Sequence, residues 1–505
     1  MTRVPAVAAR NSNSAVAVEP KKVYFCKFAY TNNVLKRLKL MEWVAALGLI
    51  SISLTAQESN QVEQLRLQIK QLQENFEKQQ QLQRQQIDAL MRRIDVLNGT
   101  NASSLKVGSN ATTAPNVREW TERPWWSINP LRIGDHRASM DIGLNASFAA
   151  GGSTENDLST LQSGAHDPSR GGFNMQALEL TLNGNVDHFF RASASLHLPQ
   201  SGSVETEEAY IESLSLPGGL QLRAGQFITE FGRQNPMHLH NWSFVDSPLV
   251  SQRMFGADGM RGLGTRVSWL VPTPFYSELF LTVQNDEGET MHSFRKQLDT
   301  GKTLFGRSLD YTSPSKSLNQ LAYTPRYAAA FDLTDTQTLL LGVSAALGNN
   351  SSGPSTRSRI YGGDLTWKWK PADHSGGYPF VQWQTEGLYR EYEAGAVSGL
   401  NAETLKDYGI YSQISYGFTK GWVAGLRWDY VDRTDMATSL GGTNSYDDAE
   451  RARRWRLSPN LTWNLSENSK LRLQYNHDQR GGLGAGHTVW LQFVFSLGAH
   501  GAHSF

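Results

Sequence analysis

Between residues 139 and 497 the chain repeatedly alternates apolar and polar side chains over long stretches. In the clearest stretch an apolar residue occupies every second position from Trp422 to Tyr430, with Arg427 and Asp429 among the residues between them. Successive side chains of a β-strand point to opposite faces, so each stretch predicts a strand with one apolar and one polar face. Membrane-spanning strands need about 9–11 residues, whereas strands of soluble proteins average about 5–6. Many of the stretches have the longer length, which favours a membrane barrel.

The connections between these stretches alternate in length. Short turns are expected at Pro217–Gly219, Pro272–Pro274 and Thr419–Gly421, and long loops at 230–261 and 285–319. Outer-membrane barrels alternate short periplasmic turns with long external loops, and a soluble sandwich or propeller has no reason to do so. We therefore predict an all-β fold: a transmembrane antiparallel β-barrel of about 16 strands. An N-terminal α-helical coiled coil is expected to precede it.

Composition excludes several alternatives. Hydrophobic residues make up 39% of the chain and the mean hydropathy is −0.44, which excludes a bundle of membrane-spanning helices. Aromatic residues still reach 10%, which a barrel explains because alternate residues meet lipid and water. The formal net charge of +1 gives no reason to expect a nucleic-acid partner. The single cysteine, Cys26, precedes the export signal, so we expect no disulfide framework.

Residues 1–56 are interpreted as a leader and signal peptide. Lys36, Arg37 and Lys39 precede a short apolar run from Val44 to Leu54, and the small residue Ala56 follows. The run is too short to span a bilayer comfortably, although an uncleaved anchor helix is the alternative. Export together with a barrel predicts the outer membrane of a Gram-negative bacterium.

Residues 57–98 are interpreted as a coiled coil. Apolar residues recur at alternating spacings of three and four in a segment of Gln, Glu, Arg and Leu, at Val62, Leu65, Ile69, Leu72 and Phe76. A narrow apolar stripe of this kind needs partner helices, and we expect a homotrimer; a single helix packed on the barrel is the alternative. Residues 99–138 are assigned as a linker and pre-barrel segment, and residues 139–505 as the barrel.

Part of the chain resembles a known family. The segments Glu208–Glu212, Leu220–Phe227 and Glu230–Gly232 resemble an acidic-aromatic strand and the following strand of the phosphate-selective porin O/P family. The segments His238–Val250 and Ser496–Phe505 are similar to a group of outer-membrane proteins described as zinc-regulated or TonB-linked. The resemblance implies a 16-stranded, trimeric porin whose third external loop folds into the lumen.

Charged residues of that loop and of the lumen wall are the candidate site. Residues 230–261 are the third external loop by strand count, and its candidate constriction residues are Arg233, His238, His240, Asp246, Arg253 and Arg261. Alternation places a second set in the lumen: Arg223, Arg326, Arg427, Arg454, Arg456, Arg472, Glu212 and Glu278. Guanidinium groups lining a pore favour anions. The alternative is that these arginines form structural ion pairs with acidic residues of the wall.

Neither an enzyme nor a cofactor is expected. The sequence contains no H-E-x-x-H, P-loop or G-x-S-x-G motif. His238 and His240 could bind zinc together with His500 and His503 if the chain end met the loop, but isolated loop histidines are the alternative, and we assign no metal ligand.

The resulting hypothesis is a porin that is embedded in outer-membrane lipid and allows passive diffusion of small hydrophilic solutes, anionic ones included. Two alternatives stay open. One is a plugged barrel that anchors the outer membrane to the periplasm through its coiled coil. The other is a metal-linked, receptor-like accessory protein.

Overall fold

The computed structural model describes most of the predicted barrel. The described residues are 131–134, 139–162, 164–185, 187–198, 204–288, 290–295, 303–304, 307–308, 317–353, 355–397, 400–434 and 451–498. The predicted signal peptide, the coiled coil, most of the linker, and His500 and His503 lie outside these residues.

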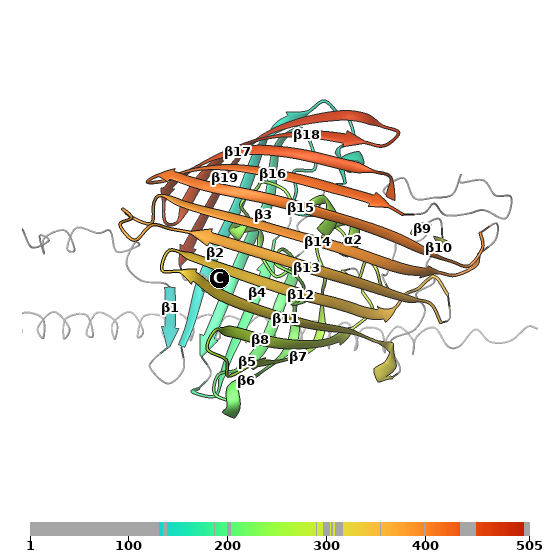
Figure 1. Ribbon diagram of the computed structural model, residues 1–505, viewed down its shortest axis with the longest axis horizontal. Helices are drawn as coiled ribbons and strands as arrows, with labels where there is room; N and C mark the ends of the chain where they lie inside the picture. The colour runs from blue at the N-terminus through green and yellow to red at the C-terminus, as the bar shows by residue number, and fades with distance from the viewer. Residues whose placement is uncertain are drawn as a thin grey trace, which may run out of the picture. The chain divides into compact units, whose positions relative to one another are not determined.

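Sixteen long antiparallel strands among the described residues form a closed ring (Figure 1). Each strand pairs with the next, β8 pairs with β11, and β19 pairs back onto β2, so the wall has no free edge. The predicted barrel fold and strand number are confirmed. The strands are β2 (Ser139–Ser153), β3 (Gly172–Asn185), β4 (Phe190–His197), β5 (Glu205–Ser213), β6 (Leu220–Ile228), β7 (Arg261–Leu270), β8 (Tyr276–Asn285), β11 (Leu321–Thr334), β12 (Gln337–Asn349), β13 (Arg357–Trp369), β14 (Phe380–Ala394), β15 (Glu403–Thr419), β16 (Trp422–Arg433), β17 (Arg454–Ser466), β18 (Ser469–Arg480) and β19 (Gly484–Gly498).

One strand was not expected. Part of the predicted linker forms β1 (Leu131–Gly134), which pairs with the first residues of β2 beyond the end of β19. A separate two-stranded sheet comprises β9 (Thr303–Leu304) and β10 (Arg307–Ser308).

The helices of the described part are short: η3 (Leu158–Leu161), η4 (Pro217–Gly219), η5 (Leu239–Asn241), α2 (Leu249–Phe255) and η6 (Leu318–Gln320). None of the described helices has the length and apolar character needed to cross a membrane.

The outer surface of the ring is apolar. Trp428 and Trp463 are 42% and 43% exposed, and Trp422 stacks on Trp463 with ring centroids 5.5 Å apart. Many Leu, Val, Ile and Phe side chains on neighbouring strands are exposed in the same way. An exposed apolar surface of this extent marks contact with lipid or protein, and on a closed barrel it is the lipid-facing band.

A charge in the middle of this band is expected to destabilise the barrel in a membrane. Val343 is the central residue of β12 and is 59% exposed. We expect Val343→Arg to lower the free energy of unfolding by about 2–4 kcal/mol, because the guanidinium group would lie near the bilayer midplane. Urea titration of the barrel in phospholipid vesicles measures this change. Leu318→Arg, at a site 75% exposed in η6, is the control, and equal tolerance of both changes would contradict a lipid-facing band.

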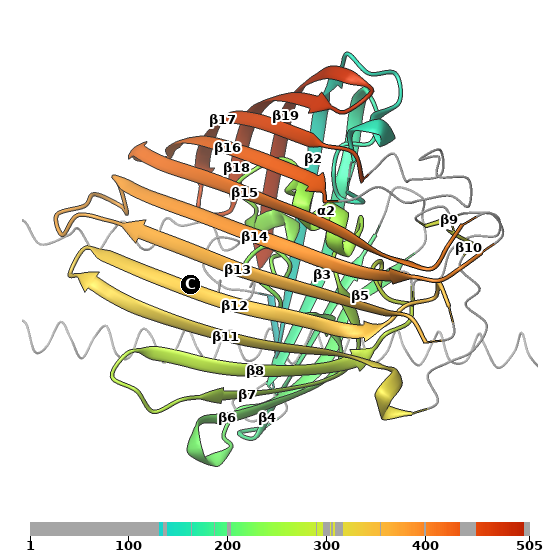
Figure 2. The ribbon, with the colours of Figure 1, turned by 45° about the vertical axis from the view of Figure 1, so that its right-hand side comes forward.

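The long loops gather at one end of the ring and the short turns at the other. Residues 229–260, here called L3, connect β6 to β7 and enter the ring with α2 inside it (Figure 2). All seven residues of α2 are buried. The helix begins after Pro248 and ends at Gly256, whose φ of 81° suits glycine and terminates the helix.

Candidate functional site: the barrel lumen

L3 crosses the lumen from β6 to the opposite wall. The Gly232 N–H donates to Ser344 Oγ of β12 at 3.1 Å, and the Gln234 N–H donates to Glu386 of β14 at 3.1 Å. Gly232 has a φ of 60°, and a Cβ there would lie 1.6 Å from Glu386 Oε1, so only glycine lets the loop approach β14 this closely. At the other side, Lys470 Nζ donates to the carbonyl oxygen of His240 at 2.7 Å.

Asp246 attaches the centre of L3 to the wall. Its carboxylate accepts a hydrogen bond from Arg427 Nη2 at 2.7 Å and lies 3.3 Å from Arg456 Nη1. The amides of Gln474 and Asn476 donate to the same carboxylate at 2.9 Å and 2.6 Å. Burial opposes ionisation, but Arg427 and Arg456 hold the pKa of Asp246 below its usual value. We call these five residues the Asp246 network; it fixes L3 by charge.

An apolar cluster attaches the second half of L3. Leu249, Val250, Met254 and Phe255 of α2 are buried against strand residues such as Leu388. Hydrogen bonds surround the cluster: Arg390 donates to the carbonyl oxygen of Arg253. Arg253 itself donates to the carbonyl oxygens of residues 451 and 452. The loop is therefore held by packing as well as by ion pairs.

Between L3 and the short-turn end lies a cavity of about 930 Å³, here called the vestibule. Its lining is rich in charged residues of both signs. The candidates that line it are Arg223, Arg233, His238, His240, Glu212 and Glu278.

The other candidates have different surroundings. Arg261 is the first residue of β7, not a loop residue. The remaining candidates are buried outside the vestibule lining: Arg326, Arg427, Arg454, Arg456, Arg472, Asp246 and Arg253.

Most of these arginines contact acids or loop carbonyls. Arg326 pairs with Asp364, and Arg456 pairs with Asp478 at 2.7 Å as well as with Asp246. Arg454 donates to the carbonyl oxygen of Thr160, and Arg472 to that of Trp242. These contacts agree with the alternative given above, in which the wall arginines form structural ion pairs. Several arginines also bind loops inside the lumen, which that alternative did not include.

An arginine cluster in the vestibule was only partly anticipated. Arg191, Arg223 and Arg266 all contact the Glu212 carboxylate, with Arg223 Nη2 at 2.7 Å and Arg266 Nη2 at 2.9 Å. Arg266 also pairs with Glu230 at 2.8 Å. Alternation could have placed Arg191 and Arg266 in the lumen, because Arg191 lies opposite Glu212 in register and Arg266 lies opposite Arg223.

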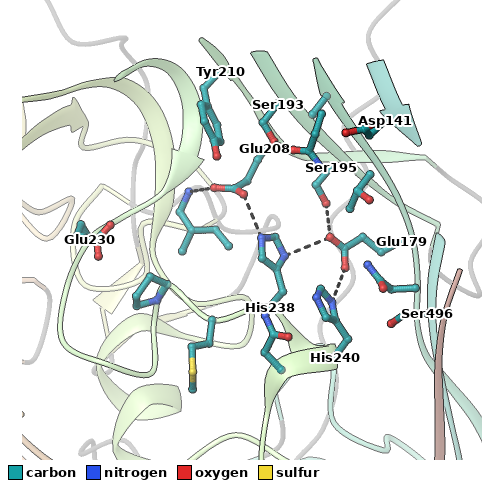
Figure 3. Close-up of a pocket in the computed structure, with 18 of the residues that line it drawn as sticks. Asp141, Glu179, Ser193, Ser195, Glu208, Tyr210, Glu230, His238, His240 and Ser496 are labelled. Atoms are coloured by element: carbon teal, nitrogen blue, oxygen red, sulfur yellow. Dashed lines mark hydrogen bonds and ion pairs between the residues drawn. The ribbon is translucent and has the colours of Figure 1, made fainter. Parts of the chain in front are cut away.

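A second cluster joins L3 to the acidic wall of the vestibule. His238 Nε2 lies 3.1 Å from Glu208, and His238 Nδ1 lies 3.3 Å from Glu179 and 3.4 Å from Glu207. His240 Nδ1 lies 3.2 Å from the other oxygen of Glu179 (Figure 3). Burial disfavours a charge on His238, but Glu179 and Glu207 raise its pKa well above the usual value.

Glu207 could not be found by alternation. A β-bulge lets Ser195 pair with Glu208 while Leu196 pairs with Thr206, so Glu207 is an extra residue in β5. Both Glu207 and Glu208 are therefore buried on the lumen side, although neighbouring strand residues normally face opposite ways.

Known proteins are similar to this chain in sequence or in structure. An uncharacterised protein of Aquifex aeolicus is 28% identical over 410 residues, which cover 75% of this chain and 82% of that protein. No family model matches the chain. Similar solved structures include the outer-membrane channel DcaP of Acinetobacter baumannii, with a TM-score of 0.47 and 13% identity over 73% of this chain and 100% of that one. An anion-selective porin from Comamonas acidovorans has a TM-score of 0.46 and 10% identity over 71% and 100%, respectively.

Proposed function

We propose that this protein is an outer-membrane channel for the passive diffusion of small hydrophilic solutes, and that L3 sets its conductance. The observation that carries the proposal is a closed ring with an apolar outer face and a charged vestibule of about 930 Å³ inside it. A lumen lined by ionisable groups admits water and ions, whereas an apolar exterior requires lipid. The proposed location is the outer membrane of a Gram-negative bacterium.

Small anions are among the proposed solutes. Three guanidinium groups, from Arg191, Arg223 and Arg266, surround the single carboxylate of Glu212 in the vestibule. The Arg191 side chain is 48% exposed and can exchange its contact with Glu212 for a contact with a passing oxyanion. Assignment to the phosphate-selective porin O/P family and assembly as a homotrimer belong to this proposal; the heptad pattern of residues 57–98 supports the trimer.

Reversal potentials across planar bilayers test the ion preference. In a KCl gradient the wild-type channel is expected to prefer chloride, and Arg191→Gln is expected to shift the reversal potential toward that of a cation-preferring pore. Arg453→Gln is the matched control, because Arg453 is exposed and pairs with Asp432 away from the vestibule. A cation preference in the wild type, or equal shifts in both variants, would contradict the role of the arginine cluster.

A second candidate function is a closed barrel that anchors the outer membrane through its coiled coil. The observation favouring it is that Arg390, Arg427 and Arg451 are almost completely buried, as they are when loops fill the lumen beside them. Complete absence of conductance in the wild type would favour this second function. Loss of envelope integrity without loss of solute uptake, after deletion of residues 57–115, would also favour it.

A further inference from the structure

The cluster around His238 has the composition and spacing of a metal site. We propose that Glu179, Glu207 and His238 bind one divalent transition-metal ion, of which Zn²⁺ is the representative, at the inner end of the vestibule. The three side chains come from β3, β5 and L3, so the ion would tie the loop to two strands. Carboxylate oxygens and an imidazole nitrogen are common Zn²⁺ ligands, and imidazole favours a transition metal over Mg²⁺ or Ca²⁺.

The distances between the ligand atoms suit such an ion. Two ligand atoms of a tetrahedral Zn²⁺ with bonds of about 2.1 Å lie roughly 3.4 Å apart. His238 Nδ1 lies 3.3 Å from Glu179 Oε1 and 3.4 Å from Glu207 Oε2. One ligand atom from each of the three residues can be chosen so that all lie within 4.8 Å of one another. His238 Nδ1 is a buried atom that two carboxylates face at ion-pair distance, without a hydrogen bond of good geometry to either.

Surrounding groups orient the three ligands. The second ring nitrogen of His238 lies 3.1 Å from Glu208, and a carboxylate in this position fixes the tautomer of a metal-binding histidine. Glu208 is held in turn by the N–H of Ile228, at 2.9 Å. Ser195 Oγ donates to Glu179 at 2.7 Å and lies 3.3 Å from Glu207, and so holds the two carboxylates side by side.

The β-bulge in β5 is an independent observation that supports a metal site at this position. Without it, Glu207 would point toward lipid, where a carboxylate is costly. The bulge instead turns Glu207 inward beside Glu208, so that Glu207 faces Nδ1 of His238 and Glu208 faces Nε2. The His238 side chain is 21% exposed and lines the vestibule, which leaves a fourth coordination position for water or a solute.

The test measures metal binding by the detergent-solubilised full chain after removal of metal with a chelator. ZnCl₂ is the probe, and equilibrium dialysis with elemental analysis gives stoichiometry and affinity. We expect one Zn²⁺ per chain at this site and a loss of affinity of more than about 100-fold in Glu207→Gln. His240→Gln, which changes only a residue bound to Glu179, should weaken binding by roughly 10–100-fold. Glu205→Gln, at an exposed position of the same strand, should bind as the wild type does.

Several outcomes would overturn the proposal: no stoichiometric binding, equal binding by wild type and Glu207→Gln, or binding that is lost only when His500 and His503 are replaced. Glu179→Gln is a second isosteric variant, and circular dichroism of each variant establishes that the barrel is folded. The readout is metal content, so its failure is separate from failure of the channel function. A protein that conducts without binding Zn²⁺ would refute this inference and leave the channel intact.

Discussion

Replacing Asp246 with alanine is expected to release L3 from the wall and to raise the single-channel conductance several-fold. The change leaves Arg427 and Arg456 buried without the carboxylate that both contact. Removing one partner of a buried ion pair typically costs about 3–5 kcal/mol, because the remaining charge stays desolvated. Arg427 and Arg456 each keep one carboxylate, from Asp429 and Asp478 respectively, so we expect a cost toward the lower end of that range. The wall strands keep their backbone hydrogen bonds, so we expect the cost to fall on the docked position of the loop. Planar-bilayer recording of both proteins measures the result.

Asp258→Ala is the matched control for Asp246→Ala, since it removes a carboxylate from the same loop outside the Asp246 network. Asp246→Asn separates charge from hydrogen bonding, because an amide can still accept from Gln474 or Asn476 but carries no charge. We expect its conductance to lie between those of the wild type and the alanine variant. Unchanged conductance in Asp246→Ala, with a folded barrel, would show that the network does not control the passage.

Replacing Phe255 with aspartate is expected to release the second attachment of L3. Phe255 is buried and packs edge-to-face on Phe231 with ring centroids 5.0 Å apart. Truncating a buried Phe costs about 3–5 kcal/mol, and an unpaired carboxylate in the apolar cluster adds a further desolvation penalty. We expect higher conductance together with rapid proteolytic cleavage within α2, which limited proteolysis followed by mass spectrometry detects.

Phe173→Asp serves as the control for Phe255→Asp, because Phe173 is 83% exposed at the start of β3. Phe255→Leu keeps the site apolar and should leave the loop docked. If Phe255→Asp conducts and resists protease as the wild type does, the apolar cluster is not what holds α2 in the lumen. If the wild type is silent and both loop variants conduct, the resting protein is a closed barrel.

The strands and their two faces were predictable because the relevant signal is local. In β16, Leu426 and Trp428 are exposed on the outside while Arg427 and Asp429 are buried inside, as alternation indicates. The pattern has a period of two residues and needs no knowledge of distant neighbours. β1 escaped prediction for the same reason: four residues are too few to show a period.

For the candidate site, the sequence predicted which charged residues face the lumen but not which of them contact one another. Arg427 and Asp246 are 181 positions apart in the chain, and no local period relates a loop residue to a strand on the opposite wall. Arg191 was missed although its strand alternates. Its place in the arginine cluster follows from the contact with Glu212, which lies opposite it in β5, and that pairing cannot be read from β4 alone.

The sequence by itself determined a closed all-β wall that is apolar toward lipid and polar toward the lumen, because alternation and connection length are properties of neighbouring residues. Tertiary structure alone decided which wall residues hold L3 inside the lumen, that Asp246 joins two arginines, and that a bulge turns Glu207 toward His238. These features depend on strand register and on contacts between residues far apart in the chain, and an ion pair or a ligand set exists only once the ring has closed.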